Sequence, residues 1–157
     1  MADPTNELRV SASTTIAAPP ETVFAILADP RQHPRIDGSG TVRGSISGPE
    51  RLILGSRFAM NMRMGAPYLI RNKVVEHEEG RRIAWKHLGS HRWRYELEPV
   101  DLAGQPGTRV TETWDATYYP AIGRAVMKRL GMPARNRRGI EGTLPKLKAA
   151  AEADAGA

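Results

Sequence analysis

The chain has 157 residues, of which 40% are hydrophobic and 25% charged, a composition that fits one globular domain and excludes general disorder. The absence of cysteine excludes disulfides, thiolate nucleophiles and cysteine-ligated zinc or iron–sulfur centres, while the formal net charge of +6 favours anionic partners. No run of about 18 apolar residues occurs, and the N-terminus lacks the basic region and apolar core of a signal peptide. We therefore expect a cytoplasmic protein with a single domain over residues 1–157, flexible at residues 1–6 and 152–157.

The N-terminal part of the chain predicts one strand followed by two short helices. Residues 7–16 alternate between apolar and polar side chains, as a half-buried strand does. A helix then begins at Pro20, a residue that suits the first helical position, and ends at Asp29-Pro30. A further short helical turn is expected over residues 31–36.

The middle of the chain predicts six strands. Apolar and polar side chains alternate in runs that are separated by turn residues, mainly Gly and Pro. The six runs are residues 41–47, 55–64, 68–76, 82–87, 91–99 and 108–119. Because the connections are short, they indicate an antiparallel meander and not parallel strands joined by helices.

The C-terminal part predicts a short helix and a long one, which Gly131-Met132-Pro133 separates. Their apolar faces consist of Ile122, Val126 and Leu130 in the first helix and of Ile140, Leu144 and Leu147 in the second. Pro145 inside the long helix predicts a kink or a late restart.

The segment from Pro120 to Lys148 carries the excess positive charge. Its eight basic residues, against the single acid Glu141, are Arg124, Lys128, Arg129, Arg135, Arg137, Arg138, Lys146 and Lys148. A solvated helix face is the simpler interpretation, and a transient contact with an anionic membrane is the alternative. No aromatic residue follows Tyr119, so bases would have no stacking platform and we expect no nucleic-acid partner.

The order of the elements predicts an α+β fold. A seven-stranded antiparallel sheet has one face to bury, and the long amphipathic C-terminal helix can cover it. The sheet would curve around that helix, and the space between them would form a cavity.

Several segments resemble the START-like (SRPBCC) superfamily, which includes polyketide cyclases/dehydratases, lipid-transfer proteins and Bet v 1-type plant proteins. Residues 16–30, with Ala18-Pro19-Pro20-Glu21, resemble its opening, and His33-Pro34 with residues 37–40 resemble its second helix segment. Residues 79–85 and 107–114 resemble its fifth and seventh strands. The resemblance implies a helix-grip fold, with two short helices after the first strand and an internal cavity for a hydrophobic small molecule such as a lipid, isoprenoid or polyketide.

Strand alternation predicts which side chains line the cavity. Methionines at alternate positions give a soft wall, and inward aromatic rings could stack on a planar ligand, although core packing would explain both patterns. We expect the mouth near residues 24–36. The predicted ligand contacts are Phe24, Ile36, Phe58, Met60, Met62, Trp85, Trp93, Tyr95, Trp114, Tyr118, Met127 and Leu130.

His87 and Glu112 are the ionisable side chains that alternation turns inward, on strands about 10 Å apart. A neutral imidazole oriented by a carboxylate could remove a proton next to a ketone, while Tyr95 or Tyr118 donates to the developing oxyanion. The candidate catalytic residues are therefore His87, Glu112 and Tyr95. A purely structural pair, or a register that turns Glu112 to solvent, is the alternative.

Two functions stay open at this point. A carrier or sensor of a hydrophobic metabolite needs only an apolar cavity, whereas an aromatic polyketide cyclase/dehydratase also needs a base and donors. The histidines lack metal-ligand spacing, and no nucleotide-binding string occurs, so we expect no metal and no cofactor. Beyond the small-molecule ligand, we expect a monomer or homodimer.

Overall fold

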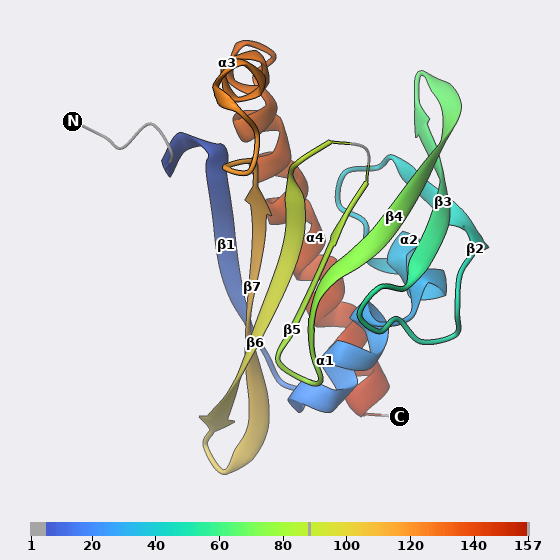
Figure 1. Ribbon diagram of the computed structural model, residues 1–157. Coiled ribbons are helices and arrows are strands. Elements are labelled where there is room, and N and C mark those ends of the chain that lie inside the picture. Colours follow the sequence, from blue (N-terminus) through green and yellow to red (C-terminus); the bar gives the residue numbers. More distant parts are fainter. Residues whose placement is uncertain (1–5, 88, 157) are drawn as a thin grey trace.

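Seven strands form one antiparallel sheet in the computed structural model, which describes residues 6–87 and 89–156 (Figure 1). The strands are β1 (Arg9–Ile16), β2 (Val42–Ser47), β3 (Arg57–Met64), β4 (Ala66–Glu78), β5 (Arg82–Lys86), β6 (Arg92–Leu102) and β7 (Gln105–Asp115). Their order is β1-β7-β6-β5-β4-β3-β2, so β2 to β7 form a meander and β1 pairs with its last strand. The predicted α+β helix-grip fold is confirmed.

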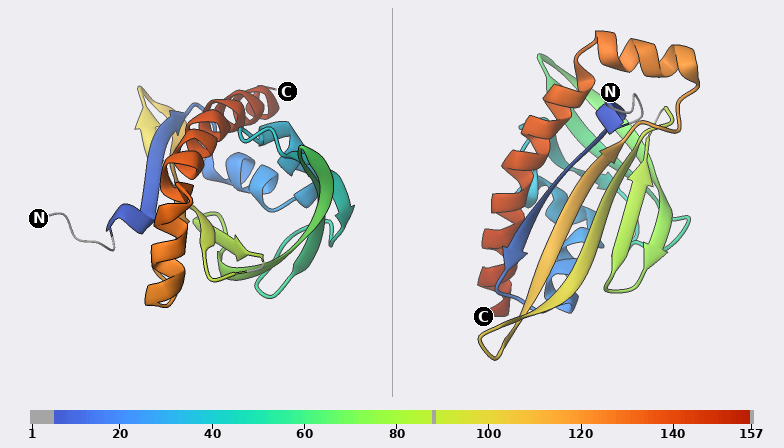
Figure 2. Two further views of the ribbon diagram at one scale, coloured as in Figure 1. Left: turned by 90° about the horizontal axis from the view of Figure 1, so that it is seen from above. Right: turned by 90° about the vertical axis from the view of Figure 1, so that its left-hand side faces the viewer.

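The helices are α1 (Pro20–Leu27), α2 (His33–Ile36), α3 (Ala121–Arg129) and α4 (Met132–Ala155), with 3-10 turns η1 (Asn6–Leu8) and η2 (Pro30–Gln32). Helices α1, α2 and α4 lie on the concave side of the sheet, whereas α3 lies at one end of the molecule (Figure 1). Figure 2 shows α4 running along the open side of the curved sheet, with α1 and α2 inside the curve. None of the helices in the described part of the chain is long and apolar enough to cross a membrane.

The apolar core joins α4 to the sheet and to α1. Ile140, Leu144 and Leu147 of α4 are buried at the helical spacing that the sequence predicts. Val23 and Phe24 of α1 are also fully buried in the same core. The end of the sheet that α1 covers is therefore filled with side chains, and free space is left elsewhere under the sheet.

A close contact between two backbones holds the loop after α2 against α4. A Cβ atom on Gly38 would clash with the backbone of Gly142 and Thr143, and one on Gly142 would lie 2.7 Å from the Gly38 carbonyl oxygen. The Gly38 N–H also donates a hydrogen bond to Thr143 Oγ1 at 3.0 Å. Only glycine permits this approach, which fixes the loop where it borders the cavity described below.

Two features of α4 bear on the sequence-based expectations. The helix continues through Pro145, which is exposed, so it does not restart there. Residues 152–155, in the segment for which we predicted flexibility, are helical. There Asp154 pairs with Arg35 at 2.8 Å, and Glu152 accepts from the Ala17 N–H at 3.0 Å. Residues 1–5 and 157 lie outside the described residues.

Candidate ligand-binding pocket

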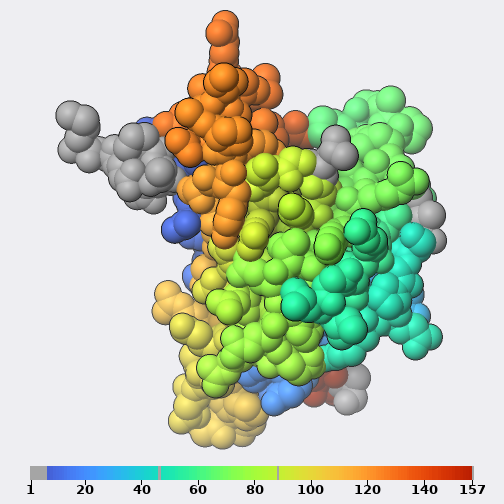
Figure 3. All heavy atoms as spheres, viewed as in Figure 1, coloured from blue at the N-terminus to red at the C-terminus, as the bar shows by residue number. Residues whose placement is uncertain are grey.

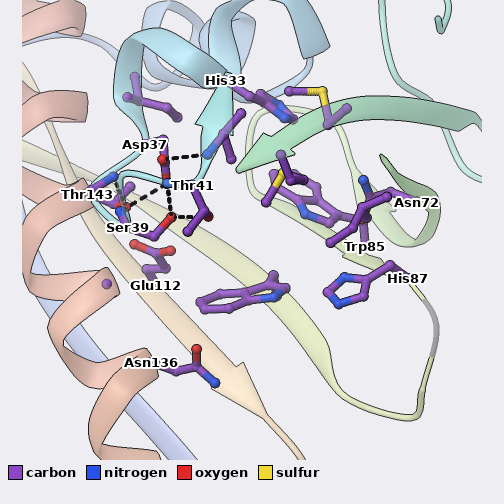
Figure 4. A pocket seen from close by; sticks show the side chains of 18 of the residues that line it. His33, Asp37, Ser39, Thr41, Asn72, Trp85, His87, Glu112, Asn136 and Thr143 are labelled. Carbon is purple, nitrogen blue, oxygen red and sulfur yellow. Dashed lines mark hydrogen bonds between the residues drawn. The ribbon is translucent and has the colours of Figure 1, made fainter. Parts of the chain in front are cut away.

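A cavity of about 420 Å³ lies between the sheet and the N-terminal half of α4. Its size is within the range of about 300–1,000 Å³ that is typical of small-molecule pockets. Figure 4 shows polar side chains entering it from several elements. The apolar part of its wall consists of Ile36, Phe58, Met60, Met62, Met64, Ile70, Trp85, Trp93 and Met132.

Strand β3 supplies the soft side of the wall. Phe58, Met60 and Met62 alternate along it and face the cavity, as the sequence predicts. Across the β3–β4 ladder, Met60 pairs with Ile70 and Phe58 with Asn72, so β4 continues the same wall. Methionine side chains have several rotatable bonds, so this side can adapt to ligands of different shape.

An aromatic cluster forms the stiffer side. The rings of His33 and Trp85 stack with centroids 4.8 Å apart, and Phe58 meets both rings edge-on. His33 Nε2 donates to the Leu27 carbonyl oxygen at 2.9 Å, and burial lowers the pKa of this imidazole, so it is neutral at pH 7. Its role is to hold Trp85 against the cavity.

Glu112 of β7 is the buried carboxyl group of the pocket. It is 2% exposed, and its Oε1 accepts a hydrogen bond from the Tyr95 hydroxyl at 2.8 Å. Its Oε2 is buried and has no hydrogen-bond partner among the described residues. Burial, together with the charge of Asp37, raises the pKa of Glu112 to about 8 despite the Tyr95 bond. The carboxyl group is therefore mostly protonated at pH 7.

A second polar group contains two histidines. His87 Nε2 lies 3.2 Å from His91 Nε2, and His91 Nδ1 lies 2.8 Å from the Tyr119 hydroxyl. Both imidazoles line the cavity. Burial lowers the pKa of His87, and burial together with the His87 charge lowers that of His91 to about 4. At neutral pH both rings are uncharged, and one donates its Nε2–H to the other.

The structure does not bring His87 and Glu112 together as a hydrogen-bonded pair. Each has another partner, His91 and Tyr95 respectively, and Figure 4 shows the two on opposite sides of the pocket. The expected orientation of an imidazole by this carboxylate is therefore wrong. Glu112 does point inward, which excludes the register that would expose it to solvent. The Tyr95 proton is already donated to Glu112, so that hydroxyl has no second proton for an oxyanion.

Five residues that we expected to contact the ligand lie elsewhere. Phe24 and Trp114 are fully buried in the core, because α1 and the His91 ring fill the space beside them. Tyr118 is 47% exposed and stacks on Arg92 outside the sheet, because β7 ends at Asp115. Met127 of α3 packs against the edge of the core, and Leu130, directly after that helix, is 64% exposed. None of the five is part of the cavity wall.

Other wall residues were missed, and most of them lie in segments that no periodic pattern marks. They are His33, Asp37, Gly38, Ser39, Thr41, Val42, Met64, Tyr68, Ile70, Asn72, His91, Met132, Arg135, Asn136, Arg138, Gly139 and Thr143. Many come from the α2–β2 loop and from the first turns of α4, whose position only the Gly38–Gly142 contact explains. Asn72 could have been found by alternation, because it pairs with Phe58 across the ladder.

The pocket opens at the end of the molecule that carries the β3–β4 hairpin. Its exposed wall residues include Met64 and Tyr68 on the hairpin, with Arg135 and Arg138 on α4 opposite. The mouth is therefore not at residues 24–36, where we expected it, since α1 packs into the core there. Within residues 6–87 and 89–156, no cluster of three or more His, Asp or Glu side chains is arranged to hold a metal ion.

Comparison with known families matches residues 7–152 to the model described as polyketide cyclase/dehydrase and lipid transport. This chain belongs to that family. The resemblance to START-like proteins is thereby confirmed, in the same order of elements. An uncharacterized protein of Mycobacterium tuberculosis (strain H37Rv), Rv0088, is 44% identical over 142 residues. That match covers 88% of this chain and 62% of the relative, so the chain spans less than two thirds of the length of this relative.

Several solved structures have a similar fold. Protein NE0264 of Nitrosomonas europaea is 15% identical with a TM-score of 0.68, covering 96% of this chain and 98% of that one. The AHSA1-like protein of Aeromonas hydrophila is 20% identical with a TM-score of 0.64, covering 92% of each chain. The di-domain ARO/CYC protein StfQ of the steffimycin biosynthetic pathway is 18% identical with a TM-score of 0.58, covering 98% of this chain and 54% of that one. At these identities the likeness concerns the fold.

Proposed function

We propose that this protein binds or transports a hydrophobic small molecule, such as a lipid, isoprenoid or polyketide, in the cavity under its sheet. The observation that carries the proposal is the wall itself, in which the β3 methionines and the aromatic cluster around Trp85 line a space of about 420 Å³. Burying apolar ligand surface there is favourable by roughly 25 cal/mol per Å². The membership of a family that includes lipid transport agrees with this function.

The Glu112 carboxyl group adds a polar requirement to the ligand. A protonated carboxyl donates one hydrogen bond, and its buried Oε2 has no acceptor among the described residues. A carbonyl or hydroxyl oxygen on the ligand would supply that acceptor. An ionised carboxylate of the ligand at the same place would be repelled by the negative charge of Asp37, which also acts on Glu112. We infer a neutral ligand with an apolar body and an oxygen at its inner end.

A dye-binding experiment tests the proposal. Nile red is a neutral polycyclic molecule with one ketone oxygen, and its fluorescence rises in apolar surroundings. Met62→Trp should fill part of the cavity and weaken dye binding by about tenfold or more, because the ring displaces the ligand. Asn61→Trp, on the outer face of the same strand, should leave binding unchanged. If neither substitution changes dye binding, the cavity is not the binding site.

A cyclase/dehydratase is the second candidate function, because the pocket holds both a protonated acid and a neutral imidazole. In an aldol cyclisation, His87 would remove a proton from the carbon next to one ketone, and that carbon would bond to a second carbonyl carbon. The oxygen of the second carbonyl would take the proton of Glu112. Only the tautomer in which His87 Nε2–H donates to His91 leaves the His87 Nδ1 lone pair available as a base.

The two candidates differ in their response to one substitution. If His87 is a general base, His87→Ala should lower cyclisation of a poly-β-ketone substrate by about 10²–10⁴-fold while Nile red still binds. A carrier should show no cyclisation in the wild-type protein. We favour the carrier, since the acid and the base lie on opposite sides of a mostly apolar pocket.

A further inference from the structure

The short helix α3 presents its apolar face to solvent. Ile122 and Val126 of α3 are 82% and 45% exposed, and Leu130, which directly follows the helix and continues this face, is 64% exposed. Apolar side chains at this spacing normally face a core, yet α3 has no buried residue among those described. A continuous exposed apolar face on a helix marks an interaction surface.

A second exposed apolar group lies at the same end of the molecule. Met64, Tyr68 and Leu69 are exposed at the tip of the β3–β4 hairpin. Figures 1 and 3 show α3 in orange and the hairpin in light green at one end, and Figure 2 shows the same arrangement from the side. The pocket mouth lies at this end, with hairpin residues on one rim and α4 residues on the other.

Basic side chains surround the exposed apolar residues of α3 and also lie beside those of the β3–β4 hairpin. No acidic residue occurs between Asp115 and Glu141, where there are six basic residues: Arg124, Lys128, Arg129, Arg135, Arg137 and Arg138. Beside the hairpin tip lies Arg63, and Arg71 lies farther along β4, whereas Arg57 and Lys73 pair at the other end of the two strands. Within the described residues, the carboxylate ion pair of the group around α3 is Lys128 with Glu7, at 2.8 Å. Most of the charge around α3 is therefore available to an external anionic partner.

We propose that this end of the molecule docks onto an anionic lipid bilayer, with the pocket mouth facing the membrane. The α3 face would enter the interface between headgroups and acyl chains, as amphipathic helices with basic polar faces do. The basic side chains beside it would contact anionic headgroups. Two separate apolar projections on either side of an opening fit a fluid surface better than the flat face of one folded protein. The proposal stands independently of which ligand the pocket holds.

Vesicle sedimentation with the full chain tests this docking. Wild-type protein should bind vesicles of phosphatidylcholine with phosphatidylglycerol at low salt, and binding should weaken as salt screens the charges over about 8 Å at physiological ionic strength. Vesicles of phosphatidylcholine alone should bind weakly. Absence of binding to the anionic vesicles at low salt overturns the proposal, and it is the result expected if the surface instead recruits an acidic protein.

Matched variants locate the docking surface. The pair Ile122→Ser and Leu130→Ser should weaken vesicle binding by about tenfold or more, because both side chains enter the interface. The pair Ile53→Ser and Leu54→Ser removes equally exposed apolar residues from the loop before β3, at the other end of that strand from the hairpin, and should have no effect. Equal losses in both pairs contradict the assignment.

A second matched set tests the charges without altering the pocket wall. Arg129→Gln with Arg137→Gln should weaken binding to anionic vesicles by about tenfold or more. Arg81→Gln with Arg109→Gln makes the same change of net charge at exposed positions elsewhere and should weaken it less. If both pairs weaken binding equally, overall charge and not this end of the molecule attracts the vesicles, and the proposal fails.

Discussion

The two faces of the sheet hold carboxyl groups in opposite protonation states. On the concave face, Glu112 is buried beside Tyr95, and its pKa is raised to about 8. On the convex face, Glu76 accepts from Arg94 at 2.8 Å, and the same guanidinium reaches Asp115 at 3.4 Å. Burial opposes ionisation there too, but the hydrogen bonds from arginine outweigh it and lower the pKa of Glu76.

The difference teaches what each face does. Strands β6 and β7 place polar residues on both faces, but only the convex face pairs its carboxylates with arginines. A paired network is satisfied in the absence of any ligand, so its role is structural. The Glu112 carboxyl has one buried oxygen without a partner among the described residues, so it suits recognition of a bound molecule.

Removing Arg94 should have the largest effect on stability. Its side chain is only 11% exposed, and Arg94→Met would remove the cation that Glu76 and Asp115 share, leaving Arg92 beside Glu76 and Arg9 beside Asp115. We expect the free energy of unfolding to fall by about 3 kcal/mol. Arg82→Met is the control, because Arg82 is 46% exposed and 3.7 Å from Glu76, and it should cost less than about 1 kcal/mol. Urea unfolding at pH 7 measures both, and equal losses would remove the distinction between these arginines.

The pH dependence of stability should have opposite signs on the two faces. Because the folded pKa of Glu112 is raised to about 8, the folded state binds the extra proton, so this stability is present below about pH 4.5 and lost as pH rises toward 8. The pKa of Glu76 is lowered, so its contribution is present above its unfolded value and lost as the pH falls through the folded value.

Glu112→Gln isolates the concave part of this dependence. Between pH 5 and pH 8 the wild type should lose about 3 kcal/mol of stability relative to the variant, because the amide never ionises. Urea unfolding of both proteins at the two pH values measures it. A wild-type stability that rises between pH 5 and pH 8, in parallel with the variant, would show that Glu112 is ionised in the folded protein.

Truncating single wall side chains should change ligand affinity, and this effect should be smaller than the stability changes above. Trp85→Ala removes a large part of the aromatic wall and should weaken Nile red binding by about tenfold, whereas His87→Ala should change it by about twofold. Fluorescence titration at pH 7 compares the two variants. A larger loss from His87→Ala would move the principal contact to the histidine side of the pocket.

Alternation in the sequence was enough to predict one part of the wall. It assigned Phe58, Met60, Met62 and Trp85 to one face of their strands, because side chains in a strand alternate strictly. It could not tell which part of an inward face meets free space and which meets the core. Trp114 is in phase with Glu112, yet it is buried against other side chains. That distinction depends on how the helices fill the curve of the sheet.

The hydrogen-bond partners of the inward polar side chains were the second feature that the sequence could not predict. His87 and Glu112 share the inward phase. The hydrogen-bond partner of the His87 imidazole is nevertheless His91, four positions later in the chain. Tyr95 lies opposite Glu112 in the β6–β7 ladder, and its hydroxyl therefore donates a hydrogen bond to the Glu112 carboxyl group. The Tyr95–Glu112 pair depends on the strand register and the His87–His91 pair on the path of the connection between β5 and β6, and neither is known before the strands are aligned.

Native mass spectrometry of the protein purified from its own host tests the central claim most directly. The wild-type protein should carry a noncovalent adduct with the mass of a hydrophobic, uncharged small molecule, which denaturation releases. Met62→Trp should lose most of that adduct because its ring occupies the cavity, while Asn61→Trp should retain it. A wild-type protein without an adduct, which also fails to take up Nile red or host lipid extract, would contradict the account.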